Sequence, residues 1–226
     1  MPTAPLAEDE KGTLLGWVLE ARPETLSVAG KKKNIEHGLL HRLDTGTEGL
    51  VLVAKTQDSY ENLYRSQSAG LIKKTYFAFC ETAGSAAREG APVLSGEKTP
   101  LCIQSRFRPF GPGRREVRPV FAGMKGFDSA KTDYETIIEK IEKADTFADS
   151  ALFAITCTLV RGYRHQVRCH LASLGYPIIG DSLYNPGQTL YPDVPLQLYA
   201  CGLSFPDPLS GVQVSFSLPS PDKMNP

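Results

Sequence analysis

The chain has 226 residues, of which 41% are hydrophobic and 22% are charged, which excludes an intrinsically disordered protein and provides enough apolar residues for a full core. Its 25 basic and 25 acidic residues balance, so it is not a uniformly basic nucleic-acid-binding protein, and no apolar run is long enough to span a bilayer. The first ten residues lack the regions of a secretory signal, and the five scattered cysteines form no CxxC pair. We therefore expect a reducing, cytoplasmic location and no membrane partner.

The first part of the chain predicts one helix and one buried strand. Within residues 1–36, apolar side chains with helical spacing predict a helix; they are Leu14, Leu15, Val18 and Leu19. A polar connection rich in lysine follows this helix. Residues 50–54 form a continuous apolar run, which is typical of a buried strand.

A helix and a second strand are predicted next. Asp58, with Glu61 three residues later, is typical of a helix N-cap, and Gly70 predicts the end of that helix. Residues 71–80 alternate between two faces and predict a strand. A strand, helix, strand unit is therefore expected over residues 50–80.

The remaining chain predicts mainly strands. Residues 82–127 are rich in Gly, Pro and Arg and have weak periodicity, so we expect short edge strands and long loops there. Residues 132–139 and 151–160 have the pattern of strands, and the charged segment 139–149 is expected to connect them.

The C-terminal part predicts a short helix and a hairpin. Residues 166–174 have helical spacing and are followed by Gly175. Residues 196–205 and 212–218 flank a turn and predict a hairpin. We therefore predict an α+β fold with a mixed, largely antiparallel central sheet flanked by short helices and loops.

Charge is unevenly distributed along the chain. Basic residues cluster in two arginine-containing segments and in a short run of lysines at residues 31–33, and acidic residues concentrate over residues 135–149. The basic segments contain Arg106, Arg108, Arg114, Arg115 and Arg118, and then Arg161, Arg164 and Arg168. Such runs are as often solvated loops as nucleic-acid contacts, so the distribution permits an RNA-binding surface without establishing one.

The segment His41-Arg42-Leu43-Asp44 places an acid beside basic residues, immediately before glycines and the apolar run. Asp44 is therefore placed where an edge residue can face a pocket, although an aspartate near glycine is more often a turn former. By the residues alone, a tyrosine such as Tyr76 on a strand is more often a packing residue, and an arginine such as Arg168 near a short helix is usually part of a surface ion pair. We expect no metal site, because His165 and His170 are five residues apart, which is not the spacing of a helical ligand pair.

Four blocks in order resemble the RluA family of RNA pseudouridine synthases. They are His41-Arg42-Leu43-Asp44 with Gly49-Leu50, then Lys73-Lys74-Thr75-Tyr76, then residues 161–172, and then residues 175–181. Residues 196–205 also resemble the terminal strand of the family, so the resemblance covers residues 37–219. It implies a pseudouridine synthase-like catalytic domain.

The resemblance implies an isomerase that converts uridine in structured RNA, tRNA or rRNA, to pseudouridine without a cofactor. Asp44 matches the catalytic aspartate of the family, which acts as a nucleophile at ribose C1′ or assists the loss of uracil; the sequence leaves acylal and glycal intermediates open. Tyr76 matches a tyrosine that stacks on the flipped uracil and serves in proton transfer. Arg168 matches an arginine that pairs with the aspartate, and Arg42 matches a residue that enters the space left by the flipped uridine.

Further residues are expected to contact the substrate. His41, Arg164, His165 and Gln166 belong to the matched blocks, and we expect all of them to lie near the bound RNA. Arg114 and Arg115, in the segment 82–127, are expected to read the shape of the RNA around the target.

Two departures from the family pattern affect these expectations. Residues 47–49 are Thr-Glu-Gly where the family commonly has Thr-Ser-Gly, so Glu48 either raises the pKa of Asp44 or points to solvent. Residues 1–36 lack the first strands of the family, with their Lys-Pro-x-Gly segment. We still expect residues 1–226 to form a single catalytic domain, as a monomer or weak dimer. The alternative is a non-catalytic RNA-binding or RNA-folding protein on the same scaffold.

Overall fold

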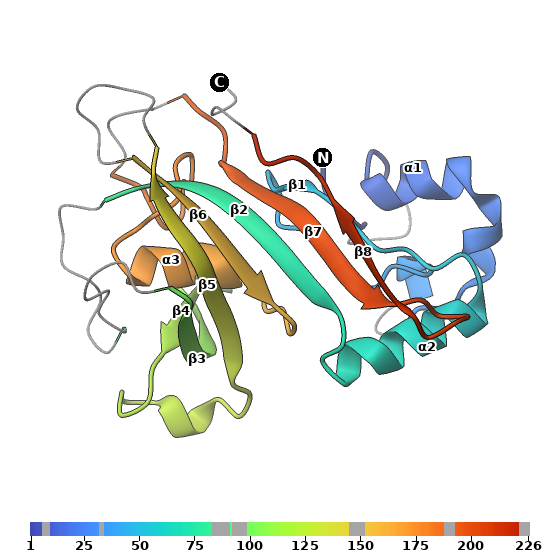
Figure 1. The fold of residues 1–226 in the computed structure, drawn as a ribbon, viewed down its shortest axis with the longest axis horizontal. Coiled ribbons are helices and arrows are strands. Elements are labelled where there is room, and N and C mark those ends of the chain that lie inside the picture. Colours follow the sequence, from blue (N-terminus) through green and yellow to red (C-terminus); the bar gives the residue numbers. More distant parts are fainter. Residues whose placement is uncertain are drawn as a thin grey trace. The chain divides into compact units, whose positions relative to one another are not determined.

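The computed structural model describes residues 1–5, 10–31, 34–82, 91, 99–144, 152–187 and 193–221 (Figure 1). The chain packs as two compact units. The N-terminal unit consists of Met1–Lys74 and Ala200–Leu218, and the central unit consists of Thr75–Tyr199 and Pro219–Pro226. This division concerns packing only, and the expected single catalytic domain stays a prediction. No helix in the described ranges has the length and apolar character needed to cross a membrane.

The first helix of the N-terminal unit is α1 (Leu14–Ala21), as predicted. It begins at Thr13, whose hydroxyl accepts a hydrogen bond of 3.0 Å from the backbone N–H of Gly16. Leu15 is buried and packs with Ala4 and Leu39. Two 3₁₀ turns follow, η1 (Pro23–Ser27) and η2 (Asn34–Glu36).

The second helix, α2 (Gln57–Ser68), has a different N-cap from the predicted one. The cap is Thr56, whose hydroxyl accepts from the backbone N–H of Ser59, and Asp58 lies inside the first turn. The prediction of Asp58 as the cap was wrong because Thr56 and Asp58 are both good capping residues and their spacing does not decide between them. The predicted end is confirmed, since Gly70 has φ +75°.

The predicted strand over residues 50–54 was wrong. The regular strand here is β1 (Glu48–Gly49), and the following segment makes one isolated bridge, between Leu39 and Val53. The segment is apolar because both of its sides are covered: Val51 and Val53 pack on the cluster of Leu15, whereas Leu50 and Leu52 pack on the cluster of α2. The continuous apolar run therefore reflects packing on both of its sides, whereas the strand that it predicted is absent from this segment.

The predicted C-terminal hairpin is confirmed. β7 (Leu198–Pro206) and β8 (Gln213–Ser217) pair antiparallel, with Leu203 opposite Phe216 and Phe205 opposite Val214. Asp207 organises the turn by accepting hydrogen bonds from the backbone N–H groups of Leu209 and Ser210. β1 lies beside β7 in this unit.

Five strands of the eight-stranded sheet belong mainly to the central unit, in the order β2-β6-β5-β3-β4 (Figure 1). Their bounds are β2 (Lys73–Glu81), β3 (Leu101–Phe110), β4 (Glu116–Val120), β5 (Tyr134–Lys143) and β6 (Leu152–Leu159). β4 pairs with β3, β3 with β5, and β5 with β6, always antiparallel. Two 3₁₀ turns, η3 (Pro112–Arg114) and η4 (Phe127–Ser129), lie in the connections.

Two predictions for this unit were partly wrong. Within residues 82–127, β4 is a short strand at the end of the strand order, as predicted, but β3 is a ten-residue strand with a partner on each side. One of its inward positions is Ser105, which is fully buried and whose hydroxyl lies 2.8 Å from Nε2 of His170. Because this inward residue is polar, the alternation of apolar and polar residues that predicts a strand is interrupted here. β5 also continues to Lys143, so the predicted charged connection is partly strand; residues 145–151 lie outside the described ranges.

The helix α3 (Gln166–Ser173) packs against β4 and β5 (Figure 1). Val167, Leu171 and Leu174 are buried in the core of this unit, and Gly175 follows with φ +86°, as predicted. The predicted α+β fold with a largely antiparallel sheet is confirmed.

Candidate active-site residues

Asp44 lies in a tight loop of the N-terminal unit. The backbone N–H of Thr47 donates to the carbonyl of Asp44 at 2.9 Å, and Gly46 within this turn has φ +88°. Thr3 fixes the residue before it, because the Thr3 hydroxyl bonds both the backbone N–H and the carbonyl of Leu43. The half-buried carboxylate of Asp44 is therefore carried by a constrained backbone, whereas Glu48 on β1 is exposed.

Gly49 is required by a close approach of two backbones. It has φ +124°, and a Cβ at this position would collide with the carbonyl oxygen of Ala200. The next residue, Leu50, donates its backbone N–H to the same carbonyl at 2.9 Å. Gly49 thus lets the loop that carries Asp44 approach the backbone of β7 closely.

His41 makes a hydrogen bond within this loop, and its predicted contact with RNA stays a prediction. Its Nε2 accepts a hydrogen bond of 3.2 Å from the backbone N–H of Leu52, so the neutral ring carries its proton on Nδ1. Burial of the ring, and then the positive charge of Lys74, lower the pKa of His41 to about 3. The imidazole is therefore neutral at physiological pH.

Arg42, unlike the buried and neutral ring of His41, is an exposed, charged side chain. Its side chain is 49% exposed, and its guanidinium Nη1 lies 3.8 Å from the carboxylate of Glu36. An exposed ion pair of this length contributes little and can rearrange readily.

Arg168 is the most firmly held of the predicted residues. It lies on α3 with 6% of its surface exposed, and its guanidinium makes a bidentate ion pair with Asp181. Nε donates to Oδ2 and Nη2 donates to Oδ1, both at 2.7 Å. Sequence reasoning missed this partner, although Asp181 ends the fourth matched block.

Asp181 is itself fixed by the turn that follows it. Its Oδ1 also accepts the backbone N–H groups of Leu183 and Tyr184, each at 3.0 Å. Gly180 has φ +77°, and a Cβ there would collide with the carbonyl of Pro195. The Gly180-Asp181 pair therefore places a carboxylate rigidly against Arg168.

The predicted pairing of Arg168 with Asp44 stays a prediction. Asp44 belongs to the N-terminal unit, whereas Arg168 and Tyr76 belong to the central unit. Tyr76, on β2, is half-buried and packs against the core cluster of the central unit.

The predicted substrate contacts at the start of α3 make hydrogen bonds within the central unit. Gln166 is buried and its amide nitrogen donates to the carbonyl of Glu135 at 2.9 Å. His165 has φ +56° at the N-cap, and its Nδ1 lies 3.1 Å from the hydroxyl of Tyr184. Arg164 donates Nη2 to the carbonyls of Arg114 and Glu116, at 2.5 and 3.2 Å. Contact of these residues with RNA stays untested.

Arg114 and Arg115 lie at the exposed turn between β3 and β4. Their side chains are therefore accessible to a large ligand. Across the described ranges, no group of three or more His, Cys, Asp or Glu residues is arranged to hold a metal ion.

Comparison with known proteins identifies the family. The family model described as RNA pseudouridylate synthase matches residues 3–173. The chain belongs to this family. The predicted membership of the RluA group of pseudouridine synthases is thereby confirmed, because ribosomal pseudouridine synthases recur among its relatives.

Two bacterial relatives illustrate the similarity. An uncharacterized RNA pseudouridine synthase of Chloroflexus aurantiacus is 30% identical over 221 residues, which are 98% of this chain and 60% of the relative. The ribosomal large subunit pseudouridine synthase D of Nitrosomonas europaea is 31% identical over 227 residues, covering 94% of this chain and 55% of the relative. The chain thus spans somewhat more than half the length of these relatives.

Solved structures show the same fold. Human RNA Pseudouridylate Synthase Domain Containing 1 superposes with a TM-score of 0.62 at 20% identity, covering 92% of this chain and 74% of that one. Human RNA Pseudouridylate Synthase Domain Containing 4 gives a TM-score of 0.52 at 19% identity, with 81% and 71% coverage.

Proposed function

We propose that this chain isomerises uridine in RNA to pseudouridine. The observation that carries the proposal is the single family match over residues 3–173, which includes Asp44, Tyr76 and Arg168. In this reaction the bond between C1′ and N1 breaks, a bond between C1′ and C5 forms, the proton on C5 leaves, and N1 gains a proton. The atoms balance without an oxidant or group donor.

Each residue has a distinct role in the proposal. The Asp44 carboxylate attacks C1′ or assists the departure of uracil, and its tight loop limits its motion. Tyr76 stacks on the uracil and takes part in proton transfer. Arg168 supplies a fixed positive charge for the reacting carboxylate.

Asp181 is a positioning residue for Arg168. Its bidentate pair fixes the plane of the guanidinium, and its backbone bonds fix the carboxylate. Arg168 therefore does not have to be ordered when the substrate binds.

The names of several relatives refer to the large ribosomal subunit. They favour ribosomal RNA over transfer RNA as the substrate of this chain. A cytoplasmic location and a monomer or weak dimer belong to the same proposal.

The test is release of tritium from ribosomal RNA labelled at uracil C5. We expect wild-type protein to release tritium and Asp44→Ala to lose about a thousandfold or more of the rate, as removal of a nucleophile does elsewhere. Glu48→Gln is the matched control, because it removes one exposed carboxylate from the same loop and should retain activity. Equal rates in Asp44→Ala and wild type would rule out the proposed role.

A further inference from the structure

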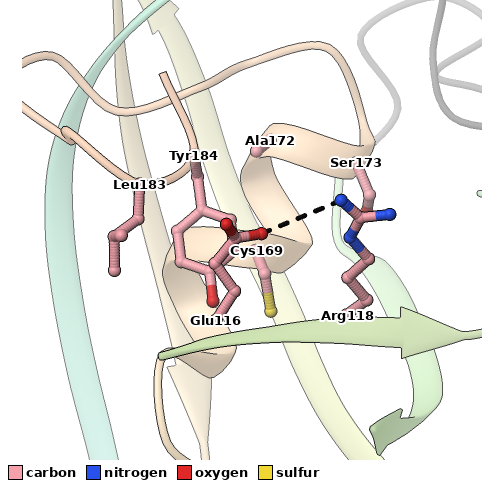
Figure 2. Close-up of a pocket in the computed structure, with 7 residues that line it drawn as sticks. All are labelled: Glu116, Arg118, Cys169, Ala172, Ser173, Leu183 and Tyr184. Carbon is pink, nitrogen blue, oxygen red and sulfur yellow. Dashed lines mark ion pairs between the residues drawn. The ribbon is translucent and has the colours of Figure 1, made fainter. Parts of the chain in front are cut away.

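Tyr184 connects several elements of the central unit around Arg168. It lies in the turn after Asp181, and its backbone N–H donates to that carboxylate at 3.0 Å. Figure 2 shows its ring projecting from this turn in front of α3, with the hydroxyl pointing toward β4. The proposed reaction gives Tyr184 no role, so its contacts are considered one by one.

The hydroxyl of Tyr184 is bonded to the edge of β4. It accepts from the backbone N–H of Val117 at 2.9 Å and donates to the carbonyl of the same residue at 3.1 Å. Val117 lies opposite Pro109 of β3, and proline has no N–H with which to pair. Because β4 is last in the described strand order, the tyrosine oxygen supplies bonds that a further strand would otherwise supply.

The same hydroxyl reaches the start of α3. It lies 3.1 Å from Nδ1 of His165, the N-cap residue, and the two rings meet edge to face with their centroids 5.8 Å apart. Arg168 lies in the first turn of this helix. One oxygen atom therefore joins β4 to the helical turn that carries Arg168.

The ring of Tyr184 lies beside the guanidinium of Arg168. The central guanidinium carbon is 5.3 Å from the ring centroid, which is within the range of a cation–π contact. Asp181 holds the same guanidinium by two hydrogen bonds of 2.7 Å. Two parallel bonds still allow a guanidinium to tilt about the line that joins them, and a contact with the ring limits this tilt.

Packing alone does not hold the ring. Tyr184 lines a cavity of ≈ 280 Å³ together with Ala172 and Ser173 of α3 (Figure 2). A side chain beside a cavity has no contact atoms on that side. The orientation of the ring therefore depends on the hydrogen bonds of its hydroxyl.

The hydroxyl keeps its proton under all ordinary conditions. Burial of the phenol, and then the nearby thiol of Cys169, raise the pKa of Tyr184 above its usual range. The hydrogen bond that the hydroxyl donates to the Val117 carbonyl is therefore present wherever the enzyme would be assayed.

We propose that Tyr184 is a positioning residue for Arg168. Its hydroxyl, anchored on Val117, orients the ring, and the ring limits the tilt of the guanidinium that Asp181 holds in place. Tyr184 thus acts through Arg168 and does not touch the substrate. The use of Arg168 in catalysis rests on the proposed function, whereas its restraint by Tyr184 is measurable without RNA.

The first experiment measures how firmly Arg168 is held in the full chain without RNA. Nuclear magnetic resonance follows hydrogen exchange of the Arg168 Nε–H, which donates to Asp181. We expect Tyr184→Phe to accelerate this exchange about tenfold, because phenylalanine keeps the ring but loses the bonds that orient it. Tyr184→Leu removes the ring as well and should accelerate the exchange about a hundredfold.

Tyr176→Leu is the matched control. Tyr176 is another half-buried tyrosine of the central unit, and its ring packs against Phe153 and the core cluster. The control removes a ring of the same size and should leave exchange at Arg168 unchanged. Equal acceleration in Tyr176→Leu, or wild-type exchange in the Tyr184 variants, would overturn the proposal. Tyr184→Phe, which lacks a single oxygen, decides the matter if Tyr184→Leu does not fold.

A second arm follows the reaction on ribosomal RNA labelled at uracil C5. We expect kcat to fall about tenfold in Tyr184→Phe and about a hundredfold in Tyr184→Leu, because small displacements of a charged group weaken its effect on the reacting carboxylate. KM should change less than about twofold, and Tyr176→Leu should keep the wild-type kcat in its folded fraction.

The two arms separate this inference from the proposed function. Wild-type kcat in both Tyr184 variants would refute the positioning role alone. Absence of tritium release by the wild type from any RNA would refute the proposed function, and the exchange of the Arg168 Nε–H would still decide whether Tyr184 restrains the guanidinium.

Discussion

The buried pair of Arg168 and Asp181 holds a full positive charge where water is excluded. Such a charge is costly unless it is paired and hydrogen-bonded. Here the Asp181 carboxylate accepts two hydrogen bonds from the Arg168 guanidinium and two more from backbone N–H groups. The partner could not be predicted from the sequence, because it depends on how the turn after Gly180 folds back onto α3. The matched sequence blocks contain both Arg168 and Asp181, but they do not show that the two side chains form an ion pair.

Asp181→Asn should therefore be strongly destabilising. Asparagine keeps an oxygen for Leu183 and Tyr184 but leaves Arg168 as an uncompensated buried charge, which costs about 3–5 kcal/mol. Urea unfolding measures the loss. Asp193→Asn, which removes the same charge at an exposed position, is the control with a small effect, and a loss in Asp181→Asn below about 1 kcal/mol would contradict the argument. In the folded fraction, kcat should fall while KM for RNA changes little.

Two buried histidines make stability depend on pH. Burial lowers the pKa of His170 to about 3, and burial with Lys74 does the same for His41. Between pH 6.5 and 3 the unfolded chain therefore binds more protons than the folded one, so stability falls as the pH is lowered through this window. Each histidine contributes about 2 kcal/mol of that loss between pH 7 and 5.

Urea midpoints at pH 7, 6 and 5 measure this dependence. His170→Asn removes one titrating group from its site between Ser105 and Thr136 and should reduce the pH dependence by about half. A midpoint that does not change between pH 7 and 5 in the wild type would show that these rings are not buried in the neutral form.

Among the secondary-structure elements, sequence periodicity correctly predicted those whose formation depends mainly on neighbouring residues in the chain. The helices α1, α2 and α3 and the β7–β8 hairpin were predicted because capping, glycine and spacing act within a few residues. The strand β3 was not, since its central Ser105 is buried by a hydrogen bond to His170, 65 residues away. The apolar segment 50–54 misled for a related reason, because its two sides pack on separate clusters.

The N-cap of α2 can be tested directly. Thr56→Ala removes the side-chain acceptor for the Ser59 N–H and should cost about 1 kcal/mol of stability. Asp58→Ala should cost less than half of that, because Asp58 lies in the first turn, where an acidic side chain stabilises the helix through its dipole. Thermal or urea unfolding compares the two variants, and a larger loss in Asp58→Ala would favour the cap that sequence predicted.

For the molecule as a whole, charge distribution matters more than net charge. The chain has zero net charge, yet the β3–β4 turn exposes the side chains of Arg114 and Arg115. The Arg164 guanidinium supports this turn by donating to backbone carbonyls of the turn, such as that of Arg114. Changing both side chains leaves those carbonyls in place. The turn should therefore keep its shape while losing its charge.

Arg114→Ala with Arg115→Ala should weaken binding of RNA and reduce its salt dependence. We expect the slope of log affinity against log salt to decrease by about 1 to 2, since up to two phosphate contacts are lost. Lys125→Ala with Lys131→Ala is the matched control, with the same change of net charge in another exposed part of the unit. Equal effects of the two pairs would show that only net charge matters.

The hairpin strand β8 has a consequence for handling the protein. Within the described part of the chain it pairs only with β7, and it carries no charged residue; its Phe216 is exposed, as are Val212 and Leu218 on either side of it. Uncharged edge strands are templates for pairing with other chains, and a molecule of zero net charge has no long-range repulsion to oppose this. Self-association in light scattering should therefore be greatest near neutral pH, and a lysine in place of Ser215 or Ser217 should improve solubility without touching either compact core.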